Sequence, residues 1–177
     1  MVDQSDTELA AAARAGSDAA FARLVARHQG AVRGFLRRVL GGDRAEADDL
    51  AQEVFLTAWR SLRTLKDPAG IRAWLCGIAW RKARDRTRGV QRTRARDAAW
   101  LETTEPAPGV TPEDRLAMQA AMAALAPEVR ACVALCLAEG WSHAEASVAL
   151  SLPLGTVKSH VTRGRARLLQ ALGGSDG

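Results

Sequence analysis

The chain lacks the features that mark several large classes of protein. Its 177 residues include no tyrosine, only three phenylalanines and three cysteines, and no run of 18 apolar residues. Without such a run a membrane span is not expected, and the acidic start MVDQSDTEL is unlike the basic, then apolar, start of a signal peptide. We therefore expect a cytoplasmic protein without direct membrane insertion.

The cysteines are too few and too scattered for a disulfide framework or a metal site. Cys76, Cys132 and Cys136 each fall within an apolar helical pattern, and the three histidines are dispersed along the chain. Free cysteine commonly packs as a small hydrophobe. The expectation is three inert core thiols, with no metal and no other cofactor.

What the chain has in abundance is alanine, leucine and arginine, while β-branched residues are sparse. This composition favours helix and predicts an all-α fold. The apolar spacing and the turn residues predict helices, the second capped by Asp18, over these ranges: 6–15, 19–40, 45–62, 71–88, 113–125, 127–139, 142–149 and 153–170.

A proline-rich stretch divides these helices into two groups. The segment TTEPAPGVTP (103–112) holds three prolines in ten residues, which is typical of a semi-extended linker. Each flanking half has about 60 to 70 residues, near the lower limit for an independent core. The predicted organisation is an N-terminal extension, a helical domain, a flexible linker, a second helical domain and a tail, over residues 1–18, 19–90, 91–112, 113–172 and 173–177.

Charge is unevenly distributed along the chain. The net charge of +5 and the sequence pI of about 9.8 favour an anionic partner. Residues 81–96 hold eight basic side chains against one acid, whereas 43–53 hold five acids against one arginine. Two opposed patches indicate two different partners.

The most informative segment is Ser142–Leu169, which predicts two helices around a short turn. Ser142 and Glu145 have the spacing of a capping box, and Pro153 suits the first position of the second helix. That helix has one apolar stripe, formed by Leu154, Val157, Val161 and Leu168.

Basic and hydroxyl side chains lie off this stripe. They are Thr156, Lys158, Ser159, Thr162, Arg163 and Arg167. A helix that buries one stripe and turns such groups outward fits the major groove of DNA, as in a helix-turn-helix. The alternative is a solvated surface helix at the end of a bundle.

The helix expected at 45–62 carries the acidic patch. Asp48, Asp49, Gln52 and Glu53 crowd its start, beside an apolar face that includes Phe55. Acids near a helix N-terminus are stabilised by the helix dipole, so a purely structural role is one interpretation. Acid–base or metal chemistry is not favoured, because no histidine or second acidic cluster accompanies the patch.

The helix expected at 71–88 combines a basic face with an aromatic residue. Arg81, Arg84 and Arg88 recur at i, i+3 and i+7, and the helical wheel places Trp80 beside Arg84. Arginines that hold phosphates beside an exposed indole suit single-stranded DNA. The alternative for Trp80 is packing between the domains, since tryptophan is usually largely buried.

Three segments together resemble the extracytoplasmic-function (ECF) group of bacterial RNA polymerase sigma factors: GTVKSHVTRGRARL in the second half, and ADDLAQEVFLTAWRSL (47–62) with AWLCGIAWRKARD (73–85) in the first. The resemblance implies binding to core RNA polymerase through Asp48, Asp49, Leu50, Gln52, Glu53 and Phe55. It implies capture of the opened −10 promoter element by Lys66, Arg72, Trp80, Arg81, Arg84 and Arg88. It also implies reading of the −35 element by Gly155, Thr156, Lys158, Ser159, Thr162, Arg163 and Arg167.

The resemblance further implies that the chain is not an enzyme by itself. Its partners would be core RNA polymerase, promoter DNA and an anti-sigma factor, which could hold it at the inner membrane face. The alternative is a conventional helix-turn-helix regulator whose first half binds a ligand or dimerises. That alternative leaves the acidic helix and the arginine face unexplained.

The chain departs from the family pattern at several positions. Trp80 stands where a basic residue is usual, and Arg81 stands where asparagine is usual. Ser151 replaces the turn glycine, so we expect it to tolerate a positive φ at some strain. Ala146 replaces a larger aliphatic residue and thins the core of the second domain.

Overall fold

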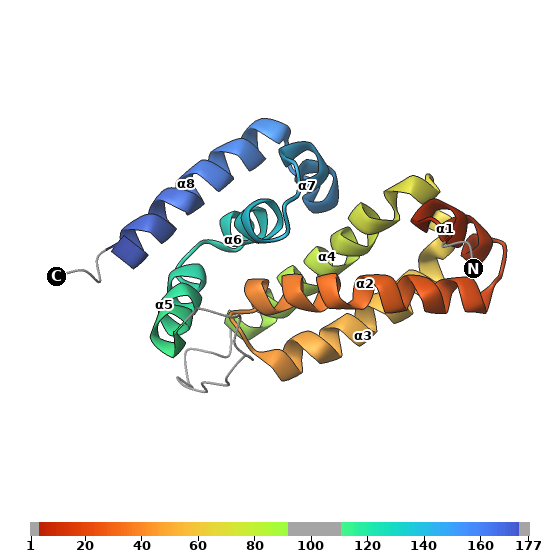
Figure 1. The fold of residues 1–177 in the computed structure, drawn as a ribbon, viewed down its shortest axis with the longest axis horizontal. Helices are drawn as coiled ribbons and strands as arrows, with labels where there is room; N and C mark the ends of the chain where they lie inside the picture. The colour runs from red at the N-terminus through yellow and green to blue at the C-terminus, as the bar shows by residue number, and fades with distance from the viewer. Residues whose placement is uncertain (1–3, 92–110, 174–177) are drawn as a thin grey trace.

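A computed structural model describes residues 4–91 and 111–173, without the side chains of 88–91 and Pro112. These residues contain helices and no strand, which confirms the all-α prediction (Figure 1). The helices are α1 (Asp6–Arg14), α2 (Asp18–Val39), α3 (Arg44–Ser61), α4 (Ile71–Gln91), α5 (Pro112–Ala123), α6 (Pro127–Val133), α7 (His143–Leu150) and α8 (Leu154–Gly173). Short helical turns are η1 (Leu62–Thr64), η2 (Pro68–Gly70) and the π-helical η3 (Ala134–Ala138).

Two helix boundaries differ from the sequence prediction. Ser17, not Asp18, caps α2, because its hydroxyl accepts a hydrogen bond from the Ala20 amide at 3.2 Å. The single helix predicted at 127–139 is α6 followed by the π-helical turn η3. The widened turn is closed by the Glu139 amide, which donates to the Ala134 carbonyl at 3.2 Å.

Helices α1 to α4 form the first bundle, in which α2 is the central element. Leu24, Phe35 and Leu36 of α2 are almost fully buried, and they belong to one core cluster with Leu50 of α3 and Leu75 of α4. Helix α1 adds buried apolar residues of its own and packs on α2 and η2. The segment before residue 19 therefore contributes to this core.

Helices α5 to α8 form the second, smaller bundle, in which α8 packs on α5, α6 and α7. Gly164 allows the close approach of α8 to α6: a Cβ at this position would lie 2.4 Å from Val133 Cγ2 and 3.0 Å from Val129 Cγ1. Ala146 is fully buried in the shared core. The helix-turn-helix is thus held by small side chains at its tightest points.

The two bundles pack directly on each other, with α7 against α4 and α6 against α2 (Figure 1). Helices α4 and α7 approach closely at Gly77, since a Cβ there would lie 3.0 Å from the Ala149 carbonyl oxygen. Buried residues of both bundles form one continuous apolar cluster. The relative placement of the bundles is therefore a packed interface.

Candidate functional sites

An apolar groove of about 500 Å³ lies between α2 and α3. Phe21 and Val25 of α2 line one wall, and Phe55, Leu56 and Trp59 of α3 line the other. The side chains of Leu56 and Trp59 are 56% and 40% exposed, although large apolar residues at helix surfaces are normally buried. The groove is therefore an unpartnered apolar face on an otherwise closed bundle.

The acidic and amide residues of α3 that were assigned to docking divide into two kinds. Asp48 is held by Arg37 and Arg33 of α2 at 3.4 and 3.5 Å, and Glu53 by Arg86 and Lys82 of α4 at 3.0 and 3.3 Å. These ion pairs tie α3 into the bundle. Asp49 and Gln52 are exposed, and Gln52 lies on the rim of the groove.

Two residues of the expected polymerase-binding set behave differently from the prediction. Leu50 is only 1% exposed, so its side chain packs in the core and offers no contact surface. Phe55 is half-buried and lines the groove. Trp59 belongs to the apolar positions expected on this helix, but Phe21, Val25 and Leu56 were not predicted. The i, i+3, i+4, i+7 spacing of Gln52, Phe55, Leu56 and Trp59 places these four on one face.

The basic residues expected at the −10 element lie on α4 and on the loop before it. Lys66, between η1 and η2, is exposed, as are Arg72 and Arg81 of α4, and Arg84 is half-buried. The guanidinium of Arg72 lies 4.3 Å from the ring centroid of Trp141, in the other bundle. The side chain of Arg88 lies outside the described residues.

The expectation of an exposed indole at Trp80 is wrong. Trp80 is only 2% exposed and belongs to the core cluster that spans both bundles. A helical wheel places it beside Arg84 but does not show which neighbouring helices cover each side of α4, which packs on α2, α3 and α7. In this conformation the indole cannot stack on a base, because almost none of its surface is accessible.

The helix-turn-helix has the local geometry that the sequence indicates. The Ser142 amide and hydroxyl both lie 2.8 Å from Glu145 Oε2, and the Glu145 amide donates back to the Ser142 hydroxyl at 3.2 Å. The hydrogen bond from the Ser142 amide is the main cause that lowers the pKa of Glu145. Ser151 ends α7 in the left-handed region with φ of 54°, as its place at the turn predicted.

Helix α8 exposes the face that the sequence assigned to DNA. Thr156 is partly exposed, and the remaining members of the set are exposed: Gly155, Lys158, Ser159, Thr162, Arg163 and Arg167. The predicted buried stripe is correct for Val157, Val161 and Leu168, but Leu154 is 42% exposed. Pro153 precedes the helix instead of occupying its first position, and its carbonyl accepts from the Val157 amide at 3.0 Å.

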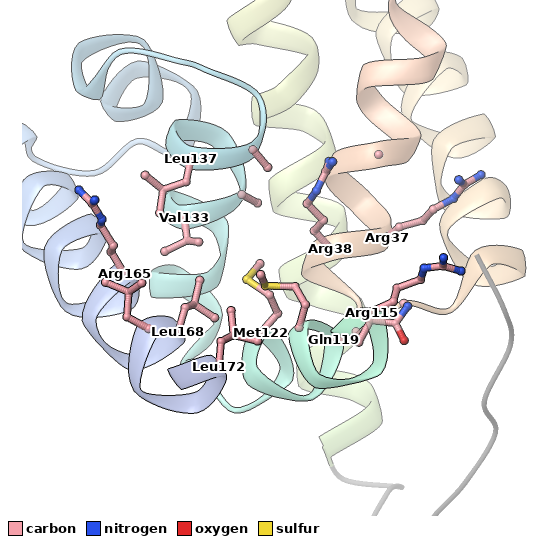
Figure 2. Close-up of a pocket in the computed structure, with 17 residues that line it drawn as sticks. Arg37, Arg38, Arg115, Gln119, Met122, Val133, Leu137, Arg165, Leu168 and Leu172 are labelled. Atoms are coloured by element: carbon pink, nitrogen blue, oxygen red, sulfur yellow. The ribbon is translucent and has the colours of Figure 1, made fainter. Parts of the chain in front are cut away.

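A larger groove of about 540 Å³ lies where the two bundles meet (Figure 2). Its apolar floor comes from α5, α6 and α8, including Met122, Val133 and Leu168, and Arg38 projects from α2 on the opposite side (Figure 2). Arg165 lies at the edge of the groove. No local sequence pattern predicts this groove, because neither bundle forms it alone.

The cysteines are placed as the sequence analysis expected, with Cys76 and Cys132 buried and Cys136 partly buried. Burial raises the pKa of Cys76 and of Cys132 to about 12, so these thiols stay protonated at neutral pH. Among residues 4–91 and 111–173, no helix is long and apolar enough to cross a membrane.

Comparisons with known proteins match both halves of the chain. Residues 24–93 match the family model of sigma-70 region 2, and residues 115–168 match that of sigma-70 region 4. The two matches occur in the order in which the two bundles follow each other, which defines the class of protein as a sigma-70-type transcription initiation factor.

Similar proteins identify the family within this class. The chain is 35% identical over 173 residues to the ECF RNA polymerase sigma factor SigM of Mycobacterium tuberculosis, and the alignment covers 97% of this chain and 86% of that protein. It is 32% identical over 180 residues to the sigma factor CnrH of Cupriavidus metallidurans, covering 94% and 93%. The chain belongs to the ECF family of RNA polymerase sigma factors.

Two solved structures share the fold. CnrH in complex with the cytosolic domain of CnrY has a TM-score of 0.70 at 29% identity, covering 97% of this chain and 99% of that chain. RpoE in complex with the anti-sigma factor NepR from Bartonella quintana has a TM-score of 0.72 at 25% identity, covering 86% and 96%. The conventional helix-turn-helix regulator is not favoured, since both halves match sigma-factor regions.

Proposed function

We propose that this ECF sigma factor docks on core RNA polymerase through the groove between α2 and α3. The observation that carries the proposal is the exposed apolar pair Leu56 and Trp59 beside Asp49 and Gln52. An apolar stripe flanked by the acid Asp49 and the polar Gln52 suits a basic, amphipathic partner helix, which is the kind of element that the family binds at the polymerase clamp. Asp48 and Glu53 act by holding α3 in place, through their ion pairs with α2 and α4.

The test of this proposal is a single apolar-to-acidic change within the groove. Leu56→Asp should reduce affinity for core polymerase at least tenfold, because it places a charge in an apolar contact, with the helical content unchanged. Val148→Asp is the matched control, since Val148 is 71% exposed on α7 in the other bundle. Equal affinity of both variants for core polymerase would refute docking through this groove.

The promoter contacts belong to the two bundles separately. Lys66, Arg72, Arg81 and Arg84 would hold the opened −10 strand by phosphate contacts, and the exposed face of α8 would read the −35 duplex. Residues 19–90 and 113–172 would be the two recognition domains, joined by residues 91–112. The chain has no catalytic role of its own in this scheme, because phosphoryl transfer belongs to the polymerase, and its place of action is the cytoplasm.

We further propose that an anti-sigma factor regulates this chain. It would dock a helix in the interdomain groove, which is the groove of about 540 Å³ where the two bundles meet. The groove has an apolar floor, and Arg38 and Arg165 lie beside it, so an amphipathic helix with an acidic flank is complementary to it. Related chains have been solved with CnrY and with the anti-sigma factor NepR. A regulator of this kind should lose affinity for Leu169→Glu, since Leu169 lines the groove and is 61% exposed.

A further inference from the structure

Arg163, on the face of α8 that is assigned to the −35 element, is hydrogen-bonded to its own helix. Its Nε donates to the Ser159 carbonyl at 3.3 Å, and its Nη2 lies 3.1 Å from His160 Nδ1. A guanidinium has only N–H donors and no acceptor, so the second contact is a hydrogen bond only when Nδ1 carries a lone pair. The geometry therefore requires a neutral His160 whose proton is on Nε2.

His160 lies between the buried stripe of α8 and Arg163. It directly precedes the buried Val161 and is partly exposed, whereas Arg163 is exposed. Residues three or four apart are neighbours on a helix surface, and this spacing joins four side chains into one row: Thr156, His160, Arg163 and Arg167. Within this row Arg163 has His160 on one side and Arg167 on the other. His160 can therefore act on DNA through the position and the surroundings of Arg163.

The charges on α8 itself are all positive. The helix carries these basic side chains and no acid: Lys158, Arg163, Arg165 and Arg167. The helices that pack on α8 add these ionisable groups: Glu113, Asp114 and Arg115 of α5, Glu128, Arg130 and Cys132 of α6, and His143 and Glu145 of α7. Asp114 and Glu145 are engaged in the capping boxes that begin their helices. Within residues 4–91 and 111–173, none of these carboxylates forms an ion pair with His160, whose ring contacts Arg163.

A proton on Nδ1 would reverse the contact between His160 and Arg163. It would remove the acceptor of the guanidinium and set an imidazolium beside it. A DNA phosphate next to Arg163 and Arg167 would offset this repulsion, because an anion within a few ångströms favours the charged form of a base. Linkage is reciprocal, so a ligand that favours the protonated chain also binds that form more tightly.

We propose that His160 is a positioning residue for Arg163 and couples −35 DNA binding to proton uptake. Neutral His160 holds the guanidinium against α8. Protonated His160 releases it to a phosphate and adds a third cation to the row with Arg163 and Arg167. Histidine is the side chain that commonly changes its charge between pH 5 and 8, so affinity for −35 DNA rises as the pH falls through this range. The coupling rests on the −35 role proposed above for α8.

Three substitutions in the full chain, assembled with core polymerase, separate the two properties of His160. His160→Gln keeps an acceptor for Arg163 but cannot gain a charge. His160→Arg is always charged and offers no acceptor. His143→Gln is the matched control, since it makes the same change at a partly exposed histidine of α7 in the same bundle. The probe is a promoter fragment on which the wild-type holoenzyme starts run-off transcription, and its dissociation constant is measured at pH 7.5 and 6.0 over a series of salt concentrations.

The affinity of the wild type should rise about three- to tenfold relative to that of His160→Gln between pH 7.5 and 6.0, because uptake of up to one proton changes affinity by up to tenfold per pH unit. The salt slope should also steepen by up to about 0.9 as one more phosphate is neutralised. His143→Gln should behave as the wild type does. His160→Arg should bind at pH 7.5 as the wild type does at pH 6.0.

The tautomer of His160 gives a readout that needs no DNA. Histidine-selective ¹⁵N NMR of the full chain at pH 7.5 should show an unprotonated Nδ1 and a protonated Nε2, with the signal identified by its absence in His160→Gln. Addition of the promoter fragment to the holoenzyme should lower the pH dependence of binding only in chains that keep His160 neutral, which His160→Gln reproduces.

The outcomes separate this inference from the function on which it rests. If Nδ1 carries the proton in the free chain, the positioning of Arg163 is refuted. If His160→Gln keeps the pH response of the wild type, or if His143→Gln abolishes it, the coupling to protons is refuted. If neither a scrambled −35 element nor Arg163→Ala changes affinity, the −35 role of α8 and the coupling fail together, while the tautomer still tests the contact between His160 and Arg163.

Discussion

Helices α4 and α8 are of similar length and both are rich in arginine, yet they meet solvent very differently. Helix α8 buries a single stripe, Val157, Val161, Gly164 and Leu168, and leaves the rest of its surface open. Helix α4 packs on α2 and α3 on one side and on α7 on the other. It therefore buries six consecutive residues, from Leu75 to Trp80.

A DNA-reading helix can therefore be recognised from its own periodicity only when a single side of it is covered by neighbouring helices. A single buried stripe repeats every three or four residues and appears directly in the sequence. A second covering helix adds burial at positions outside that repeat.

The first prediction concerns Trp80 and Trp59, which are 2% and 40% exposed. Trp80→Ala should lower the free energy of unfolding by about 3–5 kcal/mol, because it empties a large volume in the shared core. Trp59→Ala should cost far less stability and weaken polymerase binding instead. Urea denaturation followed by circular dichroism measures the first effect. If Trp80→Ala leaves the stability unchanged but abolishes binding to single-stranded DNA, the indole is a DNA contact and not a core residue.

The second prediction concerns two exposed basic residues of α8. Lys158→Ala should cost about 1–3 kcal/mol of preference for an intact −35 element, because a base contact near the helix start is lost. Arg163→Ala should weaken binding to all sequences and lower the salt slope by about one unit, as loss of a phosphate contact does.

Holoenzyme affinity for fragments with scrambled −35 or −10 elements, repeated across salt concentrations, separates these two roles. Polymerase docking should be unchanged in both variants, since α3 lies in the other bundle. An unchanged −35 preference in Lys158→Ala would show that this residue is not a reader.

The third prediction compares two glycines in helix interiors. Gly164→Ala should destabilise the second bundle by about 1–2 kcal/mol, since its Cβ would meet Val133 at 2.4 Å and overpacking outweighs the gain in helix propensity. Gly30→Ala should stabilise by up to about 1 kcal/mol, because no atom lies within 4 Å of its Cβ. Thermal unfolding of both variants measures the two changes in stability. If Gly164→Ala stabilises the chain as Gly30→Ala does, α8 can shift away from α6.

The smallest effect is a dependence on pH confined to the first bundle. Burial lowers the pKa of His28, and the nearby carboxylate of Asp6, 2.9 Å from Nε2, only partly opposes this. Because the folded-state pKa lies below the unfolded value, protonation favours the unfolded chain. This contribution to stability is therefore complete above about pH 6.5 and declines as the pH falls below it.

His28→Gln should flatten the pH dependence of the unfolding free energy between pH 7.5 and 5.5. His143→Gln, in the second bundle, is the control. If His143→Gln flattens the profile as much as His28→Gln does, the effect does not come from the pairing of α1 with α2.

Local features were predictable because their causes lie within a few residues. The capping box at Ser142 and Glu145, the positive φ at Ser151 and the open face of α8 follow from side chains that are neighbours in sequence. The acids of α3 were predictable as a group, but not that Asp48 and Glu53 are used for ion pairs within the bundle. Their partners come from α2 and α4, which no local pattern specifies.

The amino-acid sequence alone specifies the helices, the division into two bundles, the helix-turn-helix and the family. These depend on apolar periodicity, caps and proline-rich segments, all of which are local. The packing of distant helices is what buries Leu50 and Trp80, lines a groove with Leu56 and Trp59, and places Arg72 on Trp141. Burial depends on which helices, distant in sequence, cover a given face, and the packing of α7 on α4 is such a contact.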